Sequence, residues 1–230
     1  MDFYPLKSDF IDIHSHHTER EEGVFRIQNV FSSDFGDIPS DRPISIGLHP
    51  WHLSPQSIQD LPEVMKQALS FPNVMAIGEA GIDKVIRKTV EEQLPVFRKQ
   101  IELAAKYRKP LIIHCVKAFP ELLVLRKEFA ESGTWIVHGF NANDAIAREC
   151  VEAGIFISLS QRLFRNPEKA REIANVVPLS MIFAETDDDP MPIREVYAAI
   201  SGLYGISLSE LKTKIHENYI ASMGSGGAIG

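Results

Sequence analysis

The segment Asp12-Ile13-His14-Ser15-His16 carries the first side chains able to bind a metal ion. On a β-strand, side chains at positions i, i+2 and i+4 point to the same side. His14 and His16 can therefore direct both imidazoles at one ion. Asp12 lies one step deeper on the same face and is suited to orient a ligating histidine through its carboxylate. The spacing is compatible with a metal site on this strand, and an H-x-H triplet that arises by chance is the alternative interpretation.

Four further residues with metal-binding chemistry close other predicted strands. They are Glu79 at the end of AIGE, His114 at the end of PLIIH, His138 at the end of WIVH and Asp187 at the end of IFAETD. Charged side chains are rarely buried unless they are paired or bind a metal, so packing alone explains this set poorly. A metal-free network of hydrogen-bonded polar groups is the alternative interpretation.

The number of candidate ligands indicates two divalent ions. Four histidines and two carboxylates exceed what one ion takes from a protein while keeping an open position, and they suit two ions joined by a bridging carboxylate. The expected division is His14, His16 and Asp187 on one ion, His114 and His138 on the other, and Glu79 between them. Mixed nitrogen and oxygen ligation is compatible with Zn, Mn, Co or Fe, and with Mg at a labile site.

Residues beyond the predicted strands are candidates for substrate contact. His49, Trp51 and His52 follow the third strand, and an exposed indole can stack on a nucleic-acid base. Arg162 and Arg165 follow the strand IFISLS, near the loops where an α/β barrel often holds phosphate. The alternatives are a histidine bonded to the backbone, an aromatic that packs the loop, and solvated charges at a helix start.

Three residues beside the predicted ligands have supporting interpretations. Glu185 precedes Asp187 by two positions and points the same way, so it can hydrogen-bond to a ligand or to the attacking water. Asp83 is interpreted as a loop anchor. Cys115 follows His114 and is expected to point away from the site as an inert thiol.

Short β-rich runs alternate with amphipathic helical stretches, and these elements must position the candidate ligands. The predicted strands are 10–16, 24–31, 42–50, 74–82, 110–115, 135–140, 155–160 and 181–187. The predicted helices are roughly 55–70, 89–108, 118–132, 142–153, 167–176, 190–202 and 207–222. Most strands are rich in Ile, Val and Phe throughout, as expected when both faces are buried. The alternation predicts an α/β fold of the TIM-barrel type, with the active site at the C-terminal strand ends.

The first third of the barrel is expected to be trimmed. Residues 17–23 are too few for a crossover helix, and residues 32–41 have the composition of a loop. The sequence therefore predicts a distorted barrel. No linker or repeat divides the chain, so we expect one domain over residues 1–222 and a flexible C-terminal tail over 223–230.

The composition is that of an ordinary globular domain, with 44% hydrophobic and 24% charged residues among 230. Apolar runs fall far short of the ~20 residues that span a bilayer, and no secretory signal begins the chain, so no membrane partner is expected. Two cysteines are interpreted as reduced thiols in the cytoplasm. The net charge of −7 disfavours nonspecific coating of nucleic acid but is compatible with an enzyme acting on its ends. No obligate protein partner is indicated.

Six motifs occur in order along the chain: FIDIHSH, SIGLHPW, AIGEAGID, PLIIHCVKA, IVHGFN and IFAETDDDP. In these motifs the sequence resembles the TatD-type metal-dependent deoxyribonucleases of the amidohydrolase-like superfamily, over nearly all of residues 10–220. The resemblance implies a TIM barrel and a divalent-metal phosphodiesterase, commonly a DNase. It also implies that the metal ligands are His14, His16, Glu79, His114, His138 and Asp187. Lys117 stands where the family usually has Arg.

The expected reaction is hydrolysis of a phosphodiester bond, in DNA or a small phosphodiester, by metal-activated water. Asp187 would act as general base and Glu79 would bridge the ions. Lys117 and the metals would stabilise the developing charge. One alternative is an esterase, amidase or lactonase that uses the same two-metal site, because Asp188 and Asp189 would repel a phosphodiester. The other alternative is a noncatalytic metal-binding protein.

Overall fold

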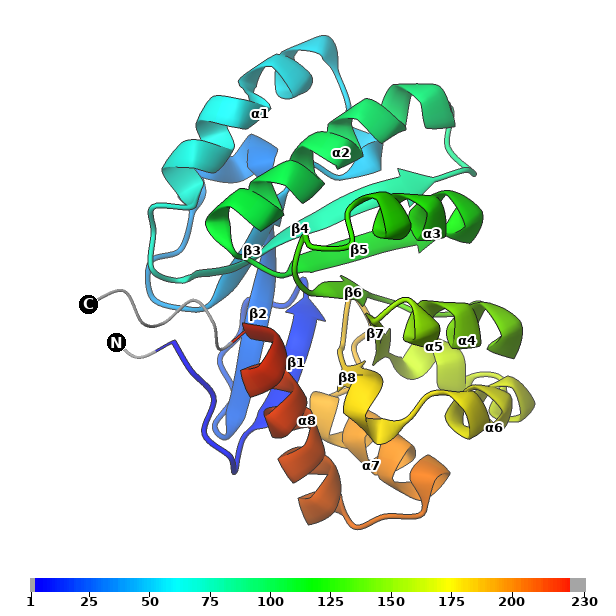
Figure 1. Ribbon diagram of the computed structural model, residues 1–230. Coiled ribbons are helices and arrows are strands. Elements are labelled where there is room, and N and C mark those ends of the chain that lie inside the picture. The colour runs from blue at the N-terminus through cyan, green and yellow to red at the C-terminus, as the bar shows by residue number, and fades with distance from the viewer. Residues whose placement is uncertain (1–2, 224–230) are drawn as a thin grey trace.

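Eight parallel strands in chain order build the fold of the computed structural model, which describes residues 3–223. They are β1 (Phe10–Ser15), β2 (Val24–Phe31), β3 (Ile44–Gly47), β4 (Val74–Asp83), β5 (Leu111–Val116), β6 (Trp135–Val137), β7 (Ile155–Leu159) and β8 (Ile182–Ala184). Each strand pairs in parallel with the next, and β1 also contacts β8. The sheet therefore curves into a nearly closed barrel, which confirms the predicted TIM-type fold (Figure 1).

Helices surround the barrel (Figure 1). They are α1 (Pro55–Ala68), α2 (Val90–Tyr107), α3 (Phe119–Glu128), α4 (Asp144–Glu152), α5 (Gln161–Phe164), α6 (Pro167–Val176), α7 (Ile193–Tyr204) and α8 (Leu208–Met223). The side chains of Ser54 and Thr89 cap the first turns of α1 and α2, which explains where these helices begin. The single-turn helix α5 was not predicted, because four residues are too few to show an apolar period.

The first third of the barrel is trimmed, as the sequence predicts. Between β1 and β2 the described chain forms no helix, and β2 leads into β3 through the short 3₁₀ helix η1 (Ser32–Asp37). Two further 3₁₀ turns occur: η2 (Pro50–His52) follows β3, and η3 (Leu179–Met181) directly precedes β8. Of the predicted tail over 223–230, only Met223 lies within the described residues, and it is the last residue of α8.

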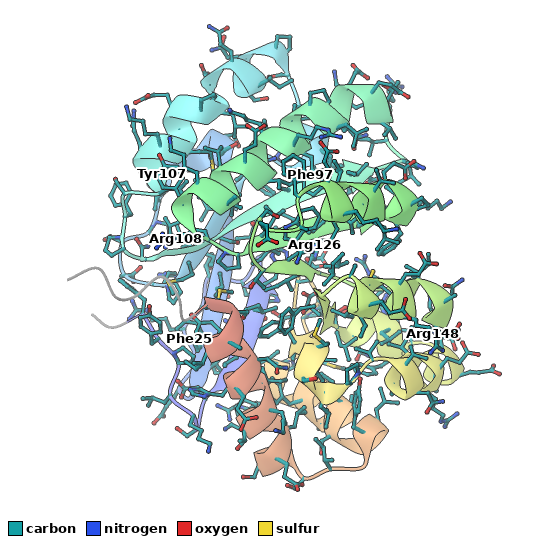
Figure 2. All side chains as sticks on the ribbon, in the orientation of Figure 1. Phe25, Phe97, Tyr107, Arg108, Arg126 and Arg148 are labelled. Carbon is teal, nitrogen blue, oxygen red and sulfur yellow. The ribbon has the colours of Figure 1, made fainter. Side chains whose placement is uncertain are left out.

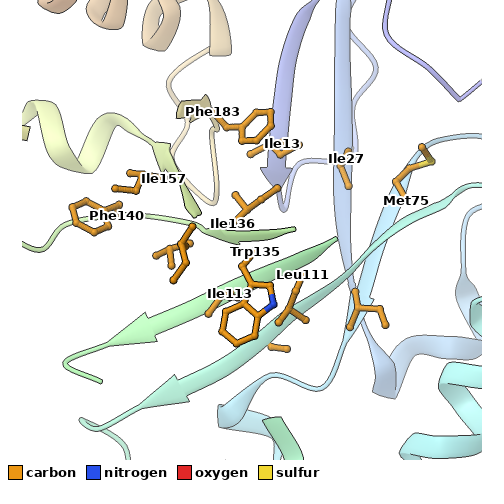
Figure 3. Packing of buried hydrophobic residues seen from close by; sticks show 14 of the residues in the cluster. Ile13, Ile27, Met75, Leu111, Ile113, Trp135, Ile136, Phe140, Ile157 and Phe183 are labelled. Atoms are coloured by element: carbon orange, nitrogen blue, oxygen red, sulfur yellow. The ribbon is translucent and has the colours of Figure 1, made fainter. Parts of the chain in front are cut away.

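Buried aliphatic and aromatic side chains fill the space inside the barrel and beneath the helices. Figure 3 shows Leu111 of β5 close to Trp135 of β6, its partner in the strand register. Trp135 packs its ring against Phe97 of α2 at 6.2 Å between centroids, whereas Arg108 and Arg148 lie on the outer surface (Figure 2). No helix within residues 3–223 is both long and apolar enough to cross a membrane.

Two contacts close the barrel between β1 and the chain after β8. The amide of His16 donates to the carbonyl of Asp187 at 2.9 Å, and the amide of Asp187 donates to the carbonyl of His14 at 3.1 Å. Deeper in the barrel, the Tyr197 hydroxyl of α7 accepts from the Ile11 amide at 2.9 Å and donates to the Ile11 carbonyl at 3.1 Å. A side chain thus satisfies backbone groups that the short β8 leaves unpaired.

Asp12 contributes to this closure and does not contact a histidine, contrary to its predicted role. Its Oδ1 accepts from the Thr186 amide at 2.9 Å, and its Oδ2 accepts from the Thr186 hydroxyl at 2.8 Å and from Arg26 Nε at 3.0 Å. The carboxylate is fully buried, so these donors replace the water that it loses. Asp12 therefore fixes β1 and the chain after β8, and supports the site only through the backbone.

Replacing Tyr197 by Phe should destabilise the protein by about 1–3 kcal/mol, because the amide and carbonyl of Ile11 lose their buried partner. Urea unfolding followed by circular dichroism measures this loss. The matched control is Tyr107→Phe, since the Tyr107 hydroxyl makes no hydrogen bond within the described chain. The control should change the unfolding free energy by less than about 0.5 kcal/mol. An equal loss in both variants would contradict the proposed role of the hydroxyl.

Candidate metal centre

The six predicted ligands converge at the C-terminal end of the barrel, beside a cavity of about 430 Å³. Their places on the strands differ from the prediction. Glu79 lies in the middle of β4, which continues to Asp83, while His138 and Asp187 follow the ends of β6 and β8. The strands β4 and β5 stay paired up to Asp83 and Val116 and so extend beyond their neighbours.

The Glu79 carboxylate lies at the centre of the cluster. Its Oε1 is 2.7 Å from His114 Nδ1 and 2.6 Å from His138 Nε2. Its Oε2 is 3.6 Å from Nε2 of both His14 and His16. The two oxygens therefore face two different pairs of histidines, although Glu79 is only 4% exposed.

Asp187 lies beside the His14 and His16 pair. Its Oδ1 is 3.6 Å from His14 Nε2 and 3.7 Å from His16 Nε2. The Asp187 backbone has a φ of 55°, a conformation rare outside glycine, Asn and Asp. The barrel-closing hydrogen bonds to β1 hold this residue in place, so the conformation that directs the carboxylate at the histidines is fixed by the backbone.

Glu185 lies behind His138. Its Oε1 accepts from the Gly139 amide at 2.5 Å and is 3.7 Å from His138 Nδ1. Glu185 is fully buried, and its Oε2 has no hydrogen-bond partner in the described structure. The carboxylate thus faces a candidate ligand from the side opposite to Glu79, a position suited to orient the imidazole.

Histidines and carboxylates shift one another's pKa values in the metal-free protein. Burial alone would disfavour the charged form of Glu79, but His138, His114 and His16 outweigh it and hold the Glu79 pKa well below its usual range. Burial likewise opposes ionisation of Asp187, yet His14 and His138 lower its pKa to about 2. Both carboxylates are therefore ionised and ready to meet cations.

The histidine pKa values move in the complementary direction. The contact with Glu79 raises the pKa of His16. Burial disfavours the charged form of His138, but Glu79 and Glu185 raise its pKa well above the ordinary value. Protons on these rings would have to leave before a metal could bind.

His49 lies deeper than the sequence suggested. Its Nδ1 accepts from the Trp51 amide at 3.1 Å, so Nε2 carries the hydrogen and donates to Glu79 Oε1 at 3.1 Å. Burial lowers the pKa of His49, which is consistent with a neutral ring. His49 lines the cavity, but both of its nitrogens are occupied and it is only 4% exposed, so its hydrogen bond holds Glu79 in place.

Asp83 anchors the loop after β4, as the sequence predicts, because its Oδ1 accepts from the Val85 amide at 2.8 Å, and it also faces the site. Its Oδ2 accepts from Trp51 Nε1 at 2.7 Å and is 3.2 Å from His114 Nε2. The signal that identifies it is its position four residues after Glu79, because both side chains lie on the same face of β4 once the strand is extended to residue 83. Trp51 itself is 61% exposed at the mouth of the cavity.

The two candidate arginines occupy different positions. Arg162 lines the cavity, and its Nη2 is 3.8 Å from Asp187 Oδ2. Arg165 instead binds Asp189 Oδ2 at 2.8 Å, and the Asp189 carbonyl accepts from His17 Nε2 at 2.9 Å. Asp189 is therefore neutralised and held away from the centre, while the exposed Asp188 lines the mouth.

Lys117 and His52 lie farther out. Lys117 is exposed and follows Val116, which lines the cavity, but its own side chain does not line it. The exposed His52 packs its ring against Phe31, with 4.5 Å between centroids. Phe31, at the end of β2, also lies 5.6 Å from the His16 ring and forms an aromatic wall of the cavity that the sequence did not reveal.

The donor set fits divalent metal ions. His14 is completely buried, and neither of its ring nitrogens has a hydrogen-bond partner within the described chain. Leaving such polar atoms unpaired is costly unless they meet another partner. Candidate ligand atoms lie within 4.8 Å of one another in three groups: His14, His16 and Glu79; His14, His138 and Asp187; and His49, Glu79 and His114. Of the third group, His49 is already committed to two hydrogen bonds.

Comparisons with known proteins agree with this chemistry. The family of TatD related DNases matches residues 38–223. The uncharacterized metal-dependent hydrolase YabD of Bacillus subtilis (strain 168) is 29% identical over 190 residues, covering 76% of this chain and 74% of YabD. Mouse TATDN3, a candidate deoxyribonuclease by name, is 29% identical over 191 residues, covering 73% of this chain and 64% of TATDN3.

The crystal structure of YjjV, a TatD homolog from Escherichia coli K12, has the same fold. It superposes with a TM-score of 0.80 at 22% identity, over 95% of this chain and 99% of YjjV. The segment that matches the family contains Glu79, His114, His138 and Asp187. The chain therefore belongs to the TatD related DNase family and is a metal-dependent hydrolase.

Proposed function

We propose that this hydrolase uses two divalent metal ions to cleave phosphodiester bonds, with DNA as its substrate. The observation that carries the proposal is the division of the Glu79 carboxylate between two histidine pairs. Oε1 faces His114 and His138, and Oε2 faces His14 and His16. A carboxylate that serves two sets of nitrogen ligands is the arrangement expected of a bridge between two ions.

The ligands of the two ions follow from this division. Asp187 Oδ1 lies near the His14 and His16 pair and would complete that side. The proposed sites are His14, His16 and Asp187 on one side, His114 and His138 on the other, and Glu79 shared. When bound, the cations supply Lewis-acid charge that activates water and stabilises the developing charge on the phosphate. The nitrogen and oxygen donors suit Zn, Mn, Co or Fe, and Mg at a labile side.

Asp187 is the residue we assign to proton transfer. Its carboxylate is ionised, is 14% exposed and lines the cavity together with the candidate ligands His16 and His138. It can therefore accept a proton from water that attacks within the cavity, while its backbone remains fixed by β1.

Cations at the rim are assigned to the phosphate. Arg162 lines the cavity beside Asp187, and its planar guanidinium can donate to two phosphate oxygens. Lys117 is an exposed, flexible cation next to the lining residue Val116, so we assign it a looser contact with the same charge. The pairing of Asp189 with Arg165 removes one of the negative charges that would repel a phosphodiester. DNA is the substrate class that the family description and the name TATDN3 support.

Removing metal should abolish hydrolysis of single-stranded DNA and bis-p-nitrophenyl phosphate, because the ligand side chains supply no Lewis acid themselves. Protein treated with a chelator and then dialysed should regain activity when Mn²⁺ or Mg²⁺ is added. A panel of carboxyl esters, assayed beside the phosphodiesters, should be hydrolysed at least about 100-fold more slowly. Faster cleavage of the esters would replace the phosphodiesterase proposal with an esterase.

Glu79→Gln should lower kcat for bis-p-nitrophenyl phosphate by at least about 100-fold, the size of effect that losing one preorganised electrostatic contact commonly has. The amide cannot carry the negative charge shared between the two histidine pairs. Circular dichroism should show an unchanged fold, and the exposed Glu168→Gln on α6 serves as the charge-matched control. Turnover near that of the wild type would remove Glu79 from the bridging role.

Arg162→Ala should lower kcat/KM for DNA by about 10- to 100-fold, the loss expected for a charge-assisted hydrogen bond. Arg148→Ala is the matched control, because Arg148 is exposed on α4 and does not line the cavity. Its effect should stay within about threefold. Steady-state kinetics on one oligonucleotide compares the two variants, and equal losses would contradict the assignment of Arg162 to the phosphate.

A further inference from the structure

A continuous path of hydrogen-bonding groups joins the exposed Trp51 to the centre of the metal site. Trp51 Nε1 donates to Asp83 Oδ2 at 2.7 Å. His114 Nε2 is 3.2 Å from the same oxygen, and His114 Nδ1 is 2.7 Å from Glu79 Oε1. The path begins on η2, crosses the end of β4 and reaches β5. One buried oxygen atom therefore contacts both a rim aromatic and a candidate ligand.

The Asp83 carboxylate is held firmly in this position. Its Oδ1 accepts from the Val85 amide at 2.8 Å. The Gln93 side chain of α2 accepts from the Asp83 amide and donates to the Asp83 carbonyl, both at 2.8 Å. Asp83 and Gln93 are each 1% exposed. Because the backbone and one oxygen are fixed, Asp83 Oδ2 cannot turn to follow a moving partner.

The position of Asp83 Oδ2 determines which ring nitrogen of His114 is available to a cation. Both oxygens of the Asp83 side chain accept hydrogen bonds, Oδ1 from the Val85 amide and Oδ2 from Trp51 Nε1, as those of a carboxylate do. An ionised carboxylate only accepts hydrogen bonds. His114 Nε2 must then carry a hydrogen toward Asp83, which leaves Nδ1, the atom facing Glu79, as the metal ligand.

We propose that Asp83 is a positioning residue that holds His114 as an Nδ1 ligand and thereby couples metal occupancy to the orientation of Trp51 at the mouth of the cavity. The inference rests on the proposal that His114 binds a metal. A cation bound at Nδ1 would make the Nε2 hydrogen of His114 a stronger donor to the fixed Asp83 Oδ2, and so would weaken the hydrogen bond that Trp51 donates to the same oxygen. By thermodynamic reciprocity, Trp51 in turn influences metal affinity.

The chain is well suited to a direct test, since it contains two tryptophans. Trp135 is fully buried and donates its indole hydrogen to Ser132 Oγ at 2.9 Å, away from the metal site. Zn²⁺ titrated into chelator-treated protein should therefore change the fluorescence of Trp51 and leave that of Trp135 constant. The variant Trp51→Phe should lose the fluorescence change, which identifies its source.

The decisive variant is Asp83→Asn, compared with Asp60→Asn on the exposed surface of α1 as the charge-matched control. Asp83→Asn should weaken Zn²⁺ binding about 10- to 100-fold in competition with a chelator, and should abolish the fluorescence response at saturating Zn²⁺. Asp60→Asn should match the wild type in both measurements. Wild-type affinity together with a wild-type fluorescence response in Asp83→Asn would overturn the proposal.

Two further results separate this proposal from the proposed function. If wild-type protein binds neither Zn²⁺ nor Mn²⁺, the proposed two-metal function is wrong. If the wild type binds metal and Asp83→Asn has the same Zn²⁺ affinity and fluorescence response, only the role of Asp83 is wrong and the two-metal function is unaffected. If Asp83→Asn does not fold by circular dichroism, Trp51→Phe decides, because it alters an exposed side chain. It should weaken Zn²⁺ binding about fivefold in chelator competition, and unchanged affinity would overturn the coupling.

Discussion

The Glu79 carboxylate is the feature on which the rest of the site depends. A charged group that is 4% exposed is costly to bury unless other groups replace its hydration, and here imidazoles surround it on both oxygens. The rings come from β1 and the residue that follows it, from β5 and from the chain after β6, so the carboxylate is stabilised only when these parts of the fold are in place. Its low pKa follows from the same surroundings and keeps it charged before any cation arrives.

The barrel satisfies this requirement with strands of unequal length. β4 and β5 are long and carry Glu79, Asp83 and His114 on continuous strands. β6 and β8 are three residues each, so their candidate ligands lie on the chain that follows and are held by tertiary hydrogen bonds. For Asp187 these bonds are the contacts with β1 that also close the barrel. The same backbone hydrogen bonds therefore close the barrel and hold Asp187 in the site.

Charges at the mouth are arranged so that an anionic substrate can approach. The sequence places three consecutive aspartates there, which by itself would repel a phosphodiester. In the structure the first faces the ligand histidines, the third binds Arg165, and only Asp188 remains exposed. Trp51 and Phe31 add aromatic surface to the lining of the cavity. The mouth is thus less acidic than the sequence suggests.

The sequence by itself determined the alternation of strands and helices, the barrel and the six candidate ligands, because strand periodicity and strand ends are local properties that residue types reveal. Only the tertiary structure decided which partners those residues meet. Asp12 contacts Thr186 and Arg26 and no histidine, and His49 faces Glu79. Asp83 joins His114 to Trp51. Such contacts depend on strand length, on register and on side chains that lie 14 to 174 residues apart in the sequence, and no local pattern encodes them.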